Sequence, residues 1–186
     1  MDKRLSIDNF VDNSERLEYY FTPTPFLSNF TPLMIILDEK ETHLHFEHKM
    51  WNILTPIVES QQKLQLLCKS VEEIAFEHEL EEHIYTYASG HKAYTALYCA
   101  FQCSVNALFL DTPIISLEEI SHLEEVVSKV NQVPIVYICN NNSTELESFL
   151  NSFRVQVRFE LCETLYTSKE SRVKEIMDML AKESSA

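Results

Sequence analysis

The run Pro32-Leu-Met-Ile-Ile-Leu37 carries the clearest structural signal in the sequence. It is continuously apolar, and short runs of this kind are typical of strands that are buried on both faces of a parallel sheet. Two similar runs follow at Ala107–Leu110 and Pro134–Cys139. Because segments with helical spacing separate these runs, we predict an α/β fold with three layers, in which helices cover both faces of a parallel sheet.

The other elements follow from the spacing of apolar residues and from capping signals. Leu117–Val130 repeats apolar residues at helical spacing, with Ser116 as N-cap and Glu119 in the capping-box position. We predict further helices at Thr42–Ile53, Val71–Phe76, Lys92–Cys103, Glu145–Phe153 and Ser171–Lys182, and further strands at Lys63–Cys68 and Val155–Leu161. Sites in such a sheet lie at the carboxyl ends of the strands.

We predict one globular domain, or one domain with a short appendage, in the cytoplasm. The chain has 186 residues, of which 45% are hydrophobic. Its apolar runs are much shorter than the roughly 20 residues that span a bilayer, and the N-terminus has no secretory apolar run. The five cysteines form no CxxC pair, so we interpret them as reduced, and Cys99 and Cys103 as thiols buried on one helix face.

Charge and glycine content exclude several classes of protein. The formal net charge of −14 disfavours direct nucleic-acid binding and favours a protein partner. Gly90 is the single glycine of the chain. Phosphate-binding loops need several glycines, because their backbone N–H groups approach the anion closely, so the sequence contains neither a P-loop nor a dinucleotide fingerprint.

Several phrases of the sequence resemble one family. Leu5-Ser-Ile-Asp-Asn-Phe-Val11 and the following Asn13-Ser-Glu-Arg-Leu17 resemble the entry to the AAA+ domain of DnaA and Hda proteins, and Thr42-His-Leu44 resembles the end of its P-loop. Ala107–Asp111 is similar to the Walker B strand and Val133–Asn141 to the sensor-1 strand. The resemblance implies a P-loop NTPase-like core at residues 32–168, an entry segment at 1–31, and a C-terminal helix at 169–186 that is all that remains of the lid.

The same comparison implies that the nucleotide site is degenerate. Glu41 takes the place of the family's lysine, and two unit charges about 4 Å apart repel by about 4 kcal/mol at an effective dielectric near 20. The decayed site comprises Lys40, Glu41, Thr42, Asp111 and Asn140. We therefore predict that the chain binds no cofactor and no metal, and that it is not an enzyme.

The resemblance also implies a function and partners. We predict a non-catalytic regulator or adaptor in replication initiation that contacts a DnaA-type initiator or the sliding clamp. Arg154 or Arg158 would face a neighbour's nucleotide, and Leu5 and Ile7 belong to a short peptide that resembles a clamp-binding segment. Membrane association is not expected, and homo-oligomerisation is left open.

Two alternatives belong to other classes. The first is a structural, ring-forming scaffold from a phage or a defence system, with an inactive P-loop-like fold. The second is a metal-dependent enzyme, which requires Asp38, Glu41 and Asp111 to converge within about 5 Å. The histidines between His43 and His48 lack the HExxH order, so we interpret them as the polar face of a helix.

Overall fold

The computed structural model describes residues 3–8, 16–25, 32–38, 46–77, 83–103, 105–127, 129, 134–153, 155–160 and 169–184. Within these ranges the strands form one eight-stranded sheet in the order β1-β2-β4-β3-β5-β6-β7-β8. The strands are β1 (Lys3–Asp8), β2 (Arg16–Thr22), β3 (Leu33–Leu37), β4 (Asn52–Ile57), β5 (Ile84–Ser89), β6 (Ala107–Asp111), β7 (Ile135–Cys139) and β8 (Val157–Glu160).

The sheet is mostly parallel. Strands β3 to β8 run in one direction, whereas β2 pairs antiparallel with β4, and β1 pairs antiparallel with β2. Since the parallel strands share a direction, β3, β5, β6 and β7 all end at one edge of the sheet. This edge is therefore the place where side chains from distant parts of the sequence meet.

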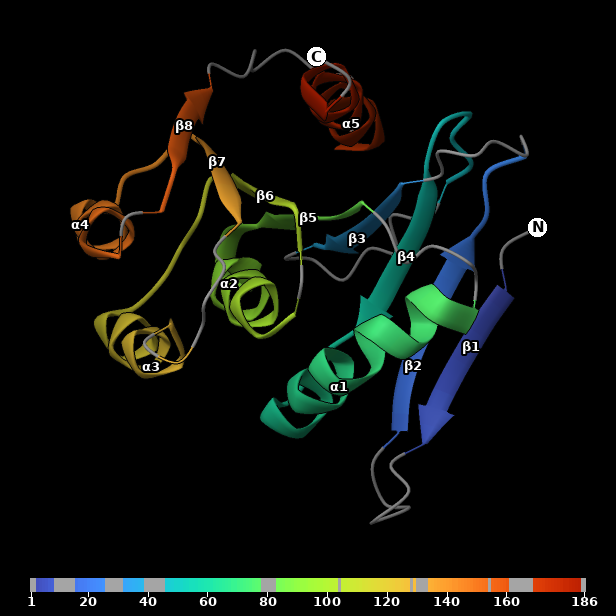
Figure 1. The fold of residues 1–186 in the computed structure, drawn as a ribbon, viewed down its shortest axis with the longest axis horizontal. Coiled ribbons are helices and arrows are strands. Elements are labelled where there is room, and N and C mark those ends of the chain that lie inside the picture. The colour runs from blue at the N-terminus through green and yellow to red at the C-terminus, as the bar shows by residue number, and fades with distance from the viewer. Residues whose placement is uncertain are drawn as a thin grey trace.

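Helices cover both faces of the sheet, but unequally. They are α1 (Gln61–Glu77), α2 (Ala93–Gln102), α3 (Leu117–Val127), α4 (Thr144–Ser152) and α5 (Lys169–Ser184), with a short 3₁₀ turn, η1 (Gly90–Lys92), before α2. The helices α1 to α4 lie on one face, and α5 lies on the other (Figure 1). The predicted α/β architecture with a parallel sheet between helices is confirmed in this general form.

Alternate residues of β3 explain why that strand is apolar throughout. Leu33, Ile35 and Leu37 pack in the core beneath α1 to α4. Met34 and Ile36 pack in the second core, beneath α5. Because both faces of the strand are covered, each side chain is removed from water, and no polar position interrupts the run.

Two predicted elements are wrong. Thr42–Ile53 does not form a helix over its described part, because residues 46–51 have no regular structure and β4 begins at Asn52. Pro56, which in our prediction ends that helix, lies inside β4 opposite Tyr19 of β2. β4 pairs with β3 only over Asn52–Leu54, so the missing N–H of Pro56 removes no bond from that ladder.

Lys63–Cys68 is helical instead of extended. It forms the first half of α1, where Leu64, Leu67 and Val71 are all buried. Their spacing of three and four residues is that of one helix face. The six-residue window was too short to distinguish this period from a strand, and the helix that we predicted at Val71–Phe76 is the second half of the same element.

Other predicted elements are confirmed. β6 and β7 match two of the apolar runs, and α2, α4, α5 and β8 lie close to their predicted positions. The capping box of α3 is also present. The backbone N–H of Ser116 donates to Glu119 Oε1 at 2.9 Å, and the backbone N–H of Glu119 donates to Ser116 Oγ at 3.2 Å. The boundaries 1–31, 32–168 and 169–186 stay a prediction. Among the described residues, no helix is long and apolar enough to cross a membrane.

Candidate active site

Four buried polar side chains mark the carboxyl edge of the sheet. Asp38 follows β3, Ser89 ends β5 and Asp111 ends β6, and these three residues expose only 5%, 5% and 4% of their surface. Tyr87, two residues before Ser89 on β5, is completely buried. Buried polar groups are costly unless they are paired, so their partners define the site.

Ser89 and Asp38 form the first pair. The Ser89 hydroxyl donates a hydrogen bond of 2.8 Å to Asp38 Oδ1, although the two residues are 51 positions apart in the sequence. β3 and β5 are direct neighbours in the sheet, with Leu37 opposite Ala88. The residues that follow each of these positions are therefore brought together at the edge.

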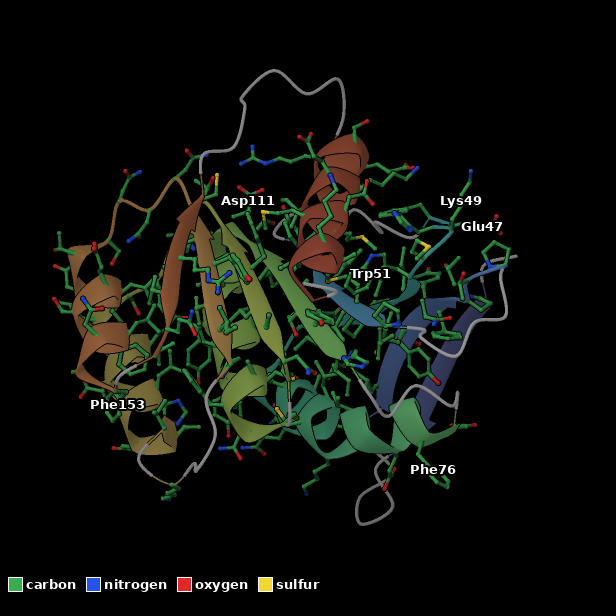
Figure 2. The ribbon with its side chains drawn as sticks, turned by 45° about the horizontal axis from the view of Figure 1, so that its top comes forward. Glu47, Lys49, Trp51, Phe76, Asp111 and Phe153 are labelled. Atoms are coloured by element: carbon green, nitrogen blue, oxygen red, sulfur yellow. The ribbon has the colours of Figure 1, made fainter. Side chains whose placement is uncertain are left out.

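Asp111 is the centre of the second group. The Tyr87 hydroxyl donates a hydrogen bond of 2.7 Å to Asp111 Oδ2, and Arg172 of α5 donates one of the same length to Asp111 Oδ1. Arg172 also lies 3.4 Å from the sulfur of Cys139, at the end of β7. Figure 2 shows Asp111 at the end of its strand beside α5. The ion pair ties α5 to this edge of the sheet.

The environment of Tyr87 favours its neutral form strongly. Burial raises the pKa of the Tyr87 hydroxyl far above its usual range, because the phenolate would lose its hydration. The negative charge of Asp111 and the hydrogen bond to it raise that pKa further. Tyr87 is therefore a permanent donor to Asp111 at neutral pH.

Three consecutive strand ends have left-handed backbone conformations. Gly90 follows β5 with φ of 53°, Thr112 follows β6 with φ of 51°, and Asn140 follows β7 with φ of 56°. Glycine and asparagine adopt this conformation readily, whereas a β-branched threonine is strained in it. The Thr112 N–H donates to the carbonyl oxygen of Cys139 at 2.9 Å, which holds the strained residue in place. Such strain is concentrated at functional sites in proteins.

No protein-family model matches the sequence, and no curated protein matches it. Among solved structures, a protein of unknown function from Agrobacterium tumefaciens, described provisionally as an α/β hydrolase, superposes with a TM-score of 0.67 at 10% identity, over 98% of this chain and 97% of that one.

Two further solved structures superpose on nearly the whole chain. An α/β serine hydrolase homologue from Coxiella burnetii has a TM-score of 0.63 at 13% identity, covering 97% of this chain and 96% of its own. Esterase 2 of Thermogutta terrifontis, phosphoramylated by tabun, has a TM-score of 0.60 at 8% identity, covering 97% and 92%. This chain has an α/β-hydrolase fold.

The α/β-hydrolase fold overturns the interpretation based on short sequence phrases. The chain is not a DnaA/Hda-like AAA+ protein, its sheet is not that of a P-loop NTPase, and the role in replication initiation is wrong together with its keywords. The expectation that the chain is not an enzyme is corrected as well, because the similar structures include esterases and a serine hydrolase homologue. The phrases misled because each is short.

Neither of the two alternative functions, the ring-forming scaffold and the metal-dependent enzyme, is supported. A scaffold with an inactive P-loop-like fold does not agree with the α/β-hydrolase fold. The metal-dependent enzyme is also not supported, because the described carboxylates of Asp38 and Asp111 have other partners: a serine hydroxyl for the first, and an arginine and a tyrosine for the second. Glu41, the third carboxylate of that hypothesis, lies outside the described residues.

The structure describes four of the other residues that we singled out, Leu5, Ile7, Asn140 and Arg158. Lys40, Glu41, Thr42 and Arg154 lie outside the described residues. Asn140 lies after β7, two strands from Ser89. In β8, Arg158 donates to the Tyr137 hydroxyl at 3.4 Å and stacks over that ring. Leu5 and Ile7 are in β1, opposite Tyr19 and Leu17 of β2. Their predicted partner, an initiator or a clamp, stays a prediction.

In α/β hydrolases that carry the G-x-S-x-G motif, the nucleophile lies on a strained turn between a strand and a helix. The same turn in this chain reads Ala88-Ser-Gly-His-Lys92, between β5 and α2. Gly90 takes the position of the motif's serine, and Ser89 is the residue directly before it. Sequence reasoning missed this site because we assigned no element to residues 84–89 and because the outer glycines of the motif are absent. The single glycine of the chain, directly after a serine, was the available signal.

Proposed function

We propose that the protein is an esterase-type hydrolase of short-chain acyl esters, with Ser89 as its nucleophile. One observation carries the proposal: the Ser89 hydroxyl donates to the buried carboxylate of Asp38 at 2.8 Å, at the last residue of β5 and directly before the strand-to-helix turn of an α/β-hydrolase fold. A serine becomes nucleophilic when an adjacent base accepts its proton, and Asp38 occupies the place of that base.

The reaction follows in two steps. The oxygen of Ser89 attacks the ester carbonyl carbon while its proton passes to Asp38, and the alcohol leaves with a proton. Water then hydrolyses the acyl-serine, which releases the carboxylic acid and restores the hydroxyl. We assign stabilisation of the oxyanion to backbone N–H groups in the first turn of α2, because the start of a helix carries partial positive charge.

The surroundings of Ser89 define the substrate class. The residue exposes 5% of its surface, so a bulky acyl group would have to displace packed side chains to reach it. We therefore expect acetyl and propionyl esters to react faster than long-chain esters. A carboxylate is ordinarily a weaker base than an imidazole, because the usual pKa of an aspartic acid is about 3.9 and that of a histidine about 6.5. With a carboxylate as the base we expect slow turnover, so the first, acylating step is the one to measure.

Active-site labelling tests the proposal. The purified chain is treated with a small alkyl fluorophosphonate, the modified residue is located by peptide mass spectrometry, and hydrolysis of p-nitrophenyl acetate is followed in parallel. We expect one adduct, at Ser89. Ser89→Ala removes both the adduct and the hydrolysis, and Asp38→Asn lowers the labelling rate by about 100-fold or more, as is usual when a general base is lost.

Ser121→Ala is the matched control, because Ser121 is an exposed serine on α3 outside the site. It should label and hydrolyse like the wild-type chain. Two outcomes would contradict the proposal: a wild-type chain that remains unlabelled at millimolar probe, or a Ser89→Ala variant that is labelled at the wild-type rate.

A further inference from the structure

Three cysteine sulfurs form a cluster on the helical face opposite α5. Cys68 lies on α1, Cys99 lies on α2, and Cys103 directly follows α2. Their sulfur atoms all lie within 4.8 Å of one another. Within the part of the chain that the structure describes, no other group of three or more histidine, cysteine, aspartate or glutamate side chains comes together in this way.

The helices determine the spacing of these sulfurs. Cys99 and Cys103 are one turn apart, and the backbone N–H of Cys103 donates to the carbonyl oxygen of Cys99 at 2.9 Å. Their sulfurs are consequently 4.0 Å apart. α1 packs against α2, and the Cys103 thiol donates to the carbonyl oxygen of Cys68 at 3.2 Å, which keeps the third sulfur at the cluster. Figure 1 shows these two helices on the same face of the sheet.

This geometry matches a three-coordinate metal site. A metal bound to three sulfurs at about 2.3 Å in one plane separates them by about 4.0 Å. The observed separations of 4.0 Å for one pair and at most 4.8 Å for the others need only a small contraction. A disulfide would require two of the sulfurs to approach to about 2.05 Å, a much larger movement within packed helices.

We propose that Cys68, Cys99 and Cys103 bind one Cu(I) ion through their three thiolates. Soft thiolate ligands select soft ions, and Cu(I) is the soft first-row ion that they favour. Structural zinc sites are almost always four-coordinate, and the described residues supply three ligands here. Hard ions such as Mg²⁺ and Ca²⁺ prefer oxygen ligands and do not fit this cluster.

The cluster has a route for the ion. Cys99 is completely buried and Cys103 nearly so, whereas Cys68 is only partly buried. An ion can therefore reach Cys68 first and pass inward to the other two sulfurs. Binding releases thiol protons, because the thiolate is the ligand form, and the site is independent of the edge of the sheet that carries Ser89.

Anaerobic titration of the reduced full chain with Cu(I), against a chromophoric Cu(I) chelator, tests the proposal. We expect one Cu(I) per chain, and X-ray absorption that shows three sulfur neighbours at about 2.3 Å. Loss of an outer-sphere partner lowers metal affinity by about 10- to 100-fold, so loss of a ligand in Cys68→Ser should lower it by at least about 100-fold. Cys68 is partly exposed, and this variant is therefore expected to fold.

Cys139→Ser is the matched control, because Cys139 lies at the end of β7, away from α1 and α2. It should bind Cu(I) as the wild-type chain does. Cu(I) should also raise the thermal midpoint of the wild-type chain and of Cys139→Ser, but not that of Cys68→Ser. Wild-type affinity in Cys68→Ser would overturn the site, as would the absence of binding. Zn(II) that displaces Cu(I) and shows four ligands would overturn the choice of ion.

Discussion

At the scale of single residues, the carboxyl edge of the sheet depends on a few buried hydrogen bonds between side chains. Tyr87 and Arg172 donate hydrogen bonds to the Asp111 carboxylate, and the Asp38 carboxylate accepts one from Ser89. Each of these groups has lost most of its hydration, so removing one partner leaves another buried polar atom without a bond. Such a loss costs more than the bond contributes while it is present.

Tyr87→Phe tests this at one position. The substitution should lower the free energy of unfolding at pH 7 by about 1–3 kcal/mol, because Asp111 loses a buried donor. The pKa of Tyr87 is raised by folding, so its contribution to stability is complete below about pH 10 and is lost as the pH rises above that value. Above pH 10, the free energy of unfolding of the wild-type chain should therefore fall with pH more steeply than that of the variant, by about 1.4 kcal/mol per pH unit. Urea unfolding between pH 7 and 11 measures both effects, and equal slopes would contradict this account.

At the scale of elements, local signals predicted some segments well and others poorly. α3 is amphipathic over three turns and has its own capping box, so nothing outside the segment was needed to find it. β4 gave no such signal. Its residues are buried because β2 and β3 lie on either side of it and helices cover the sheet, and none of these neighbours is visible in residues 52–57. Segments with their own pattern are predictable, whereas segments defined by their neighbours are not.

The capping box supplies a prediction at this scale. Ser116→Ala removes the hydroxyl that accepts from the backbone N–H of Glu119, and should destabilise the chain by about 1 kcal/mol. Amide hydrogen exchange should accelerate first in the N-terminal turn of α3. Ser121→Ala, on the exposed face of the same helix, is expected to change stability by no more than about 0.5 kcal/mol. Equal effects of the two substitutions would show that the cap contributes nothing.

At the scale of the whole molecule, the two faces of the sheet are covered unequally. Four described helices pack over one face, whereas α5 is the helix that the structure describes on the other. Val173, Ile176, Met177 and Leu180 of α5 pack over the inner strands together with Trp51, which Figure 2 shows beneath that helix. The same helix positions Arg172 against Asp111.

Met177→Ala tests this packing. Met177 is completely buried, so the cavity should lower the free energy of unfolding by about 2–5 kcal/mol. Because α5 also holds Arg172, we expect labelling of Ser89 to become less selective in the variant. Glu175→Ala, at an exposed position of the same helix, should change stability by less than about 0.5 kcal/mol. Chemical denaturation of the two variants side by side distinguishes packing from helix propensity.

The candidate sites were less predictable than the fold. Asp38 and Asp111 were visible as acidic residues at strand ends, but their partners Ser89, Tyr87 and Arg172 had no distinctive pattern. Similarly, the spacing of Cys99 and Cys103 indicated two thiols on one helix turn. The third sulfur comes from Cys68 on another helix.

Local sequence was sufficient to predict the alternation of buried strands and amphipathic helices from Ala107 onwards, the cap of α3, and the absence of a glycine-rich phosphate loop. These features depend on residues within a few positions of each other. Tertiary structure decided the strand order, which places β3 beside β5 and thereby joins Asp38 to Ser89 across 51 positions. It also decided the packing of α1 on α2, which assembles the three thiols. Local sequence constrains which element a segment forms, but contacts between distant elements depend on how the whole chain buries its apolar surface.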